Sequence, residues 1–410
     1  MTLDEIADST QRGPIGQRAD RSAGGRDHQR RDHRLAQRGT TYGSQQVEPD
    51  RSGRHHRLDG GAQPAGGSES VLGQNSSMTG PDYSPLDTAM AEWGVRVLRD
   101  SEPTTIQEAR AQARMENARA LAALSPVLVP ASEIDDEIPA DADGPAIAIR
   151  VLRPAQVPGG SDIETDPLPT VVYFHGGGWV LGDLDTHLGH ARRICSQVHA
   201  VVVSVGYRLA PEHRFPASFD DSVRATRWVG ERRADFGGSD ALVVAGDSVG
   251  GQLAASVAIA RRNAGLPLSA QLLLYPVTDV AGRYSDEAIN AEYMSRASAY
   301  QRFGLTLDTM ATFARAYVDE ADASDWRVSP KRAAQLRGVA PAVIHTSTLD
   351  VLRTEGNFYA DILAAAGVDV IAREHPSLNH SYFGLGGVSA VADAAAAQAA
   401  EDLLDILARH

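Results

Sequence analysis

The chain has 410 residues, 42% of them hydrophobic and 22% charged, so it is long enough for one large domain or for two to three of average size. Its 53 acidic residues outnumber its 39 basic ones, and the net charge of −14 argues against nucleic acid or an anionic membrane as the main partner. We therefore expect a small substrate that is not strongly anionic. The single cysteine, Cys195, excludes an intrachain disulfide and a cysteine-rich zinc site.

The first 77 residues differ in composition from the rest. They hold 11 arginines and 10 acidic residues among Gly, Gln, Ser and His, without helical or strand periodicity. Such a segment cannot bury enough apolar surface to offset its ordering entropy, so we expect residues 1–77 to be a disordered tail. An upstream start codon would explain it, with Met78 as the native start. The alternative, a nucleic-acid-binding arm at 26–38 and 51–57, is disfavoured because interleaved acids cancel the charge.

Two amphipathic helices are predicted between residues 78 and 130. Apolar residues recur near the helical period around Leu86, Met90 and Trp93, and again from Ile106 to Leu121. The sequence has no run of about 18 apolar residues, and the N-terminus lacks the apolar stretch of a secretory signal. These features predict a cytoplasmic protein that does not act at a membrane.

Beyond Pro139, short β-branched runs alternate with helical segments. The runs lie at 147–152, 170–174, 201–205, 242–245, 272–275, 343–346 and 368–372. The helical segments lie at 186–198, 216–234, 248–263, 354–366 and 387–408. This alternation predicts an α/β fold with a mainly parallel sheet that is covered by helices on both faces. Residues 278–325 are helical and aromatic, contain no strand pattern, and therefore read as an insertion.

The sequence Gly-Asp-Ser-Val-Gly at 246–250 follows a predicted strand and opens a helix, which is the context that a nucleophile elbow requires. A serine on so sharp a turn leaves no room for side chains two residues away, so glycines stand there. Alone, the pentapeptide could equally be a glycine-rich turn around an ordinary serine. A phosphate loop is disfavoured because no Gly-Lys-Ser or Gly-Lys-Thr follows.

A second motif, His-Gly-Gly-Gly-Trp at 175–179, follows another predicted strand. Three successive glycines cost backbone entropy, which favours a close approach of backbone to ligand over a plain flexible loop. We expect the N–H groups of Gly177, Gly178 and Val249 to bind an oxyanion.

A nucleophilic serine also needs a base and an acid, each just past a later strand. We expect Ser248 to be the nucleophile, His380 the base and Asp350 the acid that orients the imidazole. His345 and His375 are competing bases, but the first lies inside a predicted strand and the second precedes the turn at Pro376. Asp361 is a competing acid, but it lies on a predicted helix.

Together these motifs resemble those of the bacterial hormone-sensitive-lipase-like esterases of the α/β-hydrolase superfamily, across roughly residues 82–408. The resemblance extends to Tyr-Arg-Leu-Ala-Pro-Glu-His at 207–213 and Tyr-Pro-Val at 275–277. It implies a mostly parallel eight-stranded sheet, a triad of Ser248, Asp350 and His380, and no metal or organic cofactor. It also implies a helical cap made of residues 78–130 and an insertion at 280–322 over a catalytic domain at 131–410. Family members often form homodimers, but nothing in this sequence decides between a monomer and a homodimer.

The sequence departs from the family pattern at several positions. Val249 stands for the usual Ala, Gln252 for a common Asn and Val351 for the usual Pro after the acid. Gly206 replaces an Asp, and Ser-Tyr at 381–382 replaces Gly-Phe after the base. The change at Gly206 affects a structural contact, and Val249 keeps its N–H but crowds the oxyanion site with a branched side chain. The changes after the acid and after the base affect loop geometry around the triad.

Other residues receive structural or pocket assignments. We expect Trp179, Tyr207 and Tyr284 to line the substrate pocket. Arg208 and Glu212 are expected to anchor a turn through a salt bridge. Two histidines spaced like those of a metal-binding helix, His187 and His190, lack a convincing third ligand, so no metal site is predicted.

The sequence therefore predicts a serine carboxylesterase that hydrolyses short- to medium-chain acyl esters through an acyl-Ser248 intermediate. One alternative is an amidase, such as a formamidase, or a hydrolase of one specialised ester, on the same triad. Another is a small-molecule binding protein that resembles the family but has lost the base, against which the presence of His380 argues.

Overall fold

The computed structural model describes residues 86–98, 105–123, 128, 130–155, 168–297 and 300–410. The predictions for residues 1–77 lie outside this part of the chain. Helices α2 (Thr88–Leu98) and α3 (Ile106–Ala123) lie in the part of the chain where two amphipathic helices were predicted. Thr105 and Glu108 form a capping box at the start of α3, since the N–H of each donates to the other's side chain, at 3.2 and 3.1 Å.

An eight-stranded sheet forms the centre of the fold, with the order β1-β2-β4-β3-β5-β6-β7-β8. Its strands are β1 (Ser132–Ile138), β2 (Ile147–Arg153), β3 (Leu168–Phe174), β4 (Val201–Gly206), β5 (Gly238–Asp247), β6 (Ala270–Leu274), β7 (Ala342–Leu349) and β8 (Val370–Asn379). β2 pairs antiparallel with β1 and β4, whereas the pairs from β4 through β8 are parallel. The predicted mainly parallel α/β sheet is confirmed.

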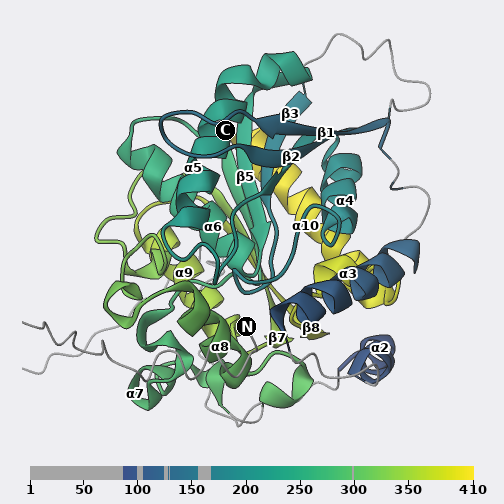
Figure 1. The fold of residues 1–410 in the computed structure, drawn as a ribbon, viewed down its shortest axis with the longest axis vertical. Helices are drawn as coiled ribbons and strands as arrows, with labels where there is room; N and C mark the ends of the chain where they lie inside the picture. Colours follow the sequence, from purple (N-terminus) through teal and green to yellow (C-terminus); the bar gives the residue numbers. More distant parts are fainter. Residues whose placement is uncertain (1–85, 99–104, 124–127, 129, 156–167, 298–299) are drawn as a thin grey trace, which may run out of the picture. The chain divides into compact units, whose positions relative to one another are not determined.

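Alternate residues of the central strands face two separate cores. Helices lie on both faces of the sheet (Figure 1). Val172 and Val244 pack with α5 (Ala217–Arg232), α6 (Val249–Asn263) and α9 (Arg353–Ala365). Val171 and Val243 pack on the other face with α4 (Leu188–Val198) and α10 (Ala390–Arg409). Because these strands are buried on both faces, they read as nearly continuous apolar runs in the sequence.

The described residues between β6 and β7 contain no strand and form a series of helices. They are η3 (Ala281–Tyr284), α7 (Glu287–Asn290), η4 (Met294–Arg296), η5 (Gln301–Phe303), α8 (Leu307–Tyr317) and η6 (Glu320–Asp322). A third core joins this insertion to Ile106 of α3 and to Trp179 and Val249 of the central domain. Further short helices are η2 (Arg233–Phe236), η7 (Pro330–Arg332) and η8 (Tyr382–Leu385).

Among the described residues, no helix combines the length and the apolar composition that a membrane span requires.

Candidate active site

Ser248 stands on the sharp turn between β5 and α6. Its backbone has φ 55° and ψ −120°, a conformation that non-glycine residues seldom adopt. A Cβ atom on Gly250 would lie 2.0 Å from the carbonyl oxygen of Phe174, and one on Gly246 would lie 2.2 Å from the carbonyl oxygen of Gly250. The two glycines of the elbow therefore stand where no side chain fits.

The three residues of the expected triad lie together at the carboxyl ends of the strands. His380 Nε2 is 2.9 Å from Ser248 Oγ, and His380 Nδ1 is 2.7 Å from Asp350 Oδ2. Asp350 follows β7 and His380 follows the neighbouring strand β8, so the parallel pairing brings them together across 30 residues of sequence. Asp350 is almost fully buried, with 1% of its surface exposed, whereas Ser248 lines the cavity described below.

The two contacts of His380 fit one tautomer of its ring. An ionised carboxylate can only accept, so this tautomer has Nδ1–H donate a hydrogen bond to Asp350 and leaves Nε2 to accept a hydrogen bond from the Ser248 hydroxyl. The other carboxylate oxygen, Asp350 Oδ1, accepts from the N–H of Leu352 at 2.9 Å. The imidazole thus has the tautomer that a general base for Ser248 needs.

The glycine loop after β3 lies beside the serine. Gly177 and Gly178 have φ values of 113° and 63° and both line the same cavity as Ser248. Among the described residues, none supplies an acceptor to their N–H groups. Val249 is the first residue of α6, so its N–H is one of those that an α-helix leaves without an internal partner.

Asp247 connects the glycine loop to the elbow, a contact that the sequence analysis did not predict. Its Oδ1 accepts from the N–H of Gly176 at 2.9 Å and from the hydroxyl of Tyr173 at 2.6 Å. Burial opposes ionisation of this carboxyl, but nearby His187 and these donors outweigh it and hold its pKa well below the usual value. The sequence motif contains Asp247 next to the serine, but it does not show that Tyr173 of β3 is the partner of Asp247.

A cavity of about 290 Å³ opens onto Ser248 and His380. Its walls include Trp93 of α2 and one face of α3, and on another side Met310 and Phe313 of α8. The Phe313 ring lies against the glycine loop so closely that a Cβ on Gly178 would be 2.1 Å from its Cδ2. The N-terminal helices and the insertion therefore both contribute to the space next to the serine.

The expected pocket residues Trp179, Tyr207 and Tyr284 are not among those that line this cavity. The Trp179 ring stacks on Tyr317 at 4.5 Å, and its Nε1 donates to Gln252 at 3.0 Å. The Tyr207 hydroxyl donates to the carbonyl of His175 at 2.6 Å. We correct the expectation: these rings fill cores around the site, because a buried aromatic residue type does not reveal which surface it faces.

Tyr284 is held in the same way. It is 2% exposed, and its hydroxyl donates to Glu355 of α9 at 3.2 Å, in the core that joins the segment after β6 to the central domain. The ring therefore packs in this core and does not line the cavity beside the serine.

The prediction that Arg208 and Glu212 form a salt bridge is wrong, because each pairs with another residue. Arg208 instead forms a two-point pair with Asp221 of α5, with both N–O distances 2.8 Å. Glu212 pairs with Arg110 of α3 at 2.9 Å, and Arg110 Nε donates to the carbonyl of Val180 at 2.9 Å. The motif at 207–213 thus connects α3 to the loop that follows the three glycines. The spacing of residues in the sequence could not show that Arg110 is the partner of Glu212.

Three possible metal ligands lie near one another in the wall of the cavity. His187, His190 and Asp247 offer ligand atoms within 4.8 Å of one another. The third member, Asp247, was not considered in the sequence. Because its Oδ1 already accepts two hydrogen bonds, we interpret this group as part of the packing that fixes the glycine loop.

The competing histidines and acid lie elsewhere. His345 Nε2 is 2.9 Å from Asp402 of α10, and His375 Nε2 is 2.9 Å from His345 Nδ1. Asp361 lies on the exposed side of α9. None of these side chains borders Ser248.

Comparison with known proteins agrees with the fold. A family model described as an alpha/beta hydrolase fold matches residues 171–384. The carboxylesterase NlhH of Mycobacterium tuberculosis is 38% identical over 314 residues, which cover 74% of this chain and 89% of that protein. The ethyl acetate hydrolase of Pseudomonas putida is 34% identical over 264 residues, or 61% of this chain and 76% of its own.

A solved structure is similar as well. The hyperthermophilic esterase from the archaeon Pyrobaculum calidifontis aligns with a TM-score of 0.67 and 33% identity, over 78% of this chain and 98% of its own. A serine hydroxyl next to a histidine that is bonded to a carboxylate is the arrangement used by serine hydrolases. The chain belongs to the α/β-hydrolase fold family, in its hormone-sensitive-lipase-like esterase branch.

Proposed function

We propose that the protein is a serine carboxylesterase that hydrolyses short- to medium-chain acyl esters through an acyl-Ser248 intermediate. The observation that carries the proposal is the position of His380, which lies within hydrogen-bond distance of both Ser248 and Asp350 at the wall of a cavity. Family membership and the names of its relatives make the protein a carboxylic ester hydrolase.

In the first step, His380 Nε2 takes the Ser248 proton while Oγ attacks the ester carbonyl carbon. The carbonyl oxygen becomes an oxyanion, to which we assign the N–H groups of Gly177, Gly178 and Val249 as donors. Asp350 stabilises the imidazolium that forms. Loss of one such donor lowers turnover by about 100- to 1000-fold in enzymes of this kind.

The second half returns the enzyme to its starting state. The imidazolium donates its proton to the leaving alcohol, the carbon–oxygen bond breaks and the acyl group stays on Ser248. A water molecule then attacks the acyl carbon with His380 as base, and the acid leaves as Ser248 recovers its proton.

The cavity's size supports short acyl groups. Its volume of about 290 Å³ is at the lower end of small-molecule pockets, and Phe313 and Met310 close one side. A relative named for ethyl acetate points to the same substrate class.

The test is turnover of a p-nitrophenyl ester series from acetate to palmitate, measured beside Ser248→Ala and with a matched p-nitroanilide for comparison. We expect turnover to peak at short chains, to exceed that of the anilide and to be abolished in the variant. Equal turnover in Ser248→Ala, or a preference for the anilide, would contradict the proposal.

A further inference from the structure

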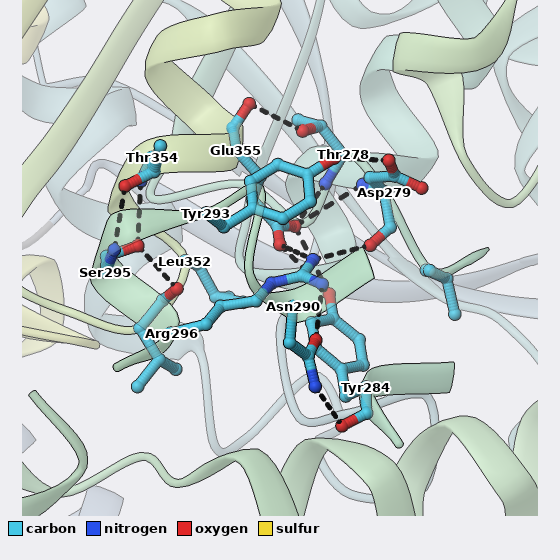
Figure 2. Close-up of polar contacts among 12 residues, drawn as sticks. Thr278, Asp279, Tyr284, Asn290, Tyr293, Ser295, Arg296, Leu352, Thr354 and Glu355 are labelled. Atoms are coloured by element: carbon cyan, nitrogen blue, oxygen red, sulfur yellow. Dashed lines mark hydrogen bonds and ion pairs between the residues drawn. The ribbon is translucent and has the colours of Figure 1, made fainter. Parts of the chain in front are cut away.

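Ser295, on the short helix η4 of the insertion, contacts the turn that carries Asp350. Its Oγ donates to the carbonyl oxygen of Val351, the residue after Asp350, at 2.8 Å. Its N–H donates to Thr354 Oγ1 at 3.0 Å, and the N–H of Thr354 donates back to Ser295 Oγ at 3.0 Å. Figure 2 shows these bonds between Ser295 and Thr354. Ser295 is fully buried, so this turn is held by hydrogen bonds that water does not replace.

The neighbouring residue anchors Ser295 in place. The Arg296 guanidinium forms an ion pair with Glu355 of α9, and both side chains have 0% of their surface exposed. The same guanidinium donates to the carbonyl oxygen of Asp279 and to Asn290 Oδ1, both at 2.9 Å (Figure 2). It also lies over the Tyr293 ring, 4.0 Å from the ring centre. A charge pair buried this deeply requires its partners in one geometry, so η4 has little freedom to shift.

The Arg296–Glu355 pair is also hydrogen-bonded to the segment after β6, which contacts the backbone of Ser248. Glu355 Oε1 accepts from the N–H of Thr278 at 2.8 Å, in the segment that follows β6. In that segment the N–H of Val277 donates to the carbonyl oxygen of Ser248 at 3.1 Å. One buried network therefore joins the backbone of Ser248 to the turn of Asp350 through the insertion.

We propose that Ser295 is a positioning residue for Asp350, through which the insertion fixes the acid against His380. The Asp350 carboxylate is oriented by its own turn, since Leu352 N–H donates to Oδ1 and Arg353 N–H donates to the Asp350 carbonyl. The Ser295 hydroxyl donates to the carbonyl oxygen of Val351, which lies in this same turn.

The inference rests on the proposed function, and its test uses one readout that needs no ester turnover. The variant is Ser295→Ala in the full chain, with Ser285→Ala as the matched control because Ser285 is an exposed serine of the same insertion. Removing this one hydrogen bond loosens the turn but leaves Asp350 in place, so we expect kcat to fall by about five- to tenfold with KM unchanged. A looser carboxylate stabilises the protonated imidazole less, so the acid limb of the kcat/KM profile moves to lower pH.

The second readout is the low-field proton NMR signal of the proton between His380 and Asp350. In Ser295→Ala we expect this signal to broaden or move upfield, and in Ser285→Ala to match the wild type. Thr354→Ala, which removes the acceptor of the Ser295 N–H, should change both readouts in the same direction.

The inference would be overturned if Ser295→Ala lowered the melting temperature but left the pH profile and the NMR signal like those of Ser285→Ala. If the wild-type protein lacks Ser248-dependent esterase activity, the proposed function fails. The NMR signal still decides whether Ser295 positions Asp350.

Discussion

The Nδ1 atom of His380 lies 2.7 Å from Oδ2 of Asp350, and the two side chains extend from the ends of adjacent parallel strands. If this contact orients the base, Asp350→Asn should lower kcat by about 10³- to 10⁴-fold, because an amide favours the wrong imidazole tautomer. The matched control is Asp361→Asn, on the exposed side of α9, which should keep full activity. Comparable kcat values in the two variants would rule out Asp350 as the acid.

The positive φ of Gly178 and its contact with Phe313 lead to a second prediction. A Cβ at Gly178 would collide with the Phe313 ring and move the N–H assigned to the oxyanion, so Gly178→Ala should lower kcat by about 100-fold or more. Gly265 has a similar φ of 69° but open space around it. Gly265→Ala should therefore cost about 1–2 kcal/mol of stability and no activity. Steady-state kinetics and urea unfolding of both variants separate strain from catalysis.

Phe313 should set the acyl-chain limit of the cavity. Truncation in Phe313→Ala opens the α8 side, and each further buried methylene contributes about 0.8 kcal/mol, or roughly a fourfold gain in kcat/KM. The optimum of the p-nitrophenyl ester series should move to longer chains. The control is Phe358→Ala, because Phe358 is an aromatic residue that has 38% of its surface exposed and does not line the cavity. An unchanged optimum in Phe313→Ala would show that another wall limits the chain.

His190 should make the fold sensitive to acid. Burial lowers the pKa of His190 from 6.5 to about 3, so the unfolded chain binds this proton first as pH falls below about 6.5. The stability from this group is complete above pH 6.5 and is lost progressively toward pH 3. Each pH unit in that window costs about 1.4 kcal/mol.

The variant His190→Leu removes this dependence. Between pH 7.5 and pH 5, its free energy of unfolding should drop by about 2 kcal/mol less than that of the wild type, measured by urea titration. His213 is exposed, so His213→Gln should behave like the wild type. If His190→Leu loses as much stability as the wild type, His190 does not titrate as a buried neutral group.

Much of the architecture could be predicted because buried parallel strands produce long apolar runs. Strand β1 was missed since its sequence, Ser-Glu-Ile-Asp-Asp-Glu-Ile, is that of a polar edge strand with only Ile138 fully buried. Strand β8 continues to Asn379, beyond the expected end at 372, because pairing with β7 extends it past its apolar part. Pairing partners, rather than local propensity, decide such cases.

At the site, the motifs specified residue types and chain order, whereas partners distant in sequence were not visible. Arg110 and Asp221, the actual partners of Glu212 and Arg208, lie on helices whose spacing gives no sign of the pairing. The same holds for Phe313, which contacts Gly178 from 135 residues later in the chain. Such contacts depend on how the insertion packs, which periodicity does not encode.

The proposed mechanism requires that Ser248 carries the acyl group. Its most direct test is reaction of the full chain with a p-nitrophenyl alkylphosphonate, followed by peptide mass spectrometry, with Ser256→Ala as a control for a buried serine of the same helix. We predict one adduct on Ser248 in the wild type and in Ser256→Ala, with loss of esterase activity in step with labelling, and no adduct in Ser248→Ala. Labelling of a different residue, or full ester turnover by a protein whose Ser248 is blocked, would contradict the account.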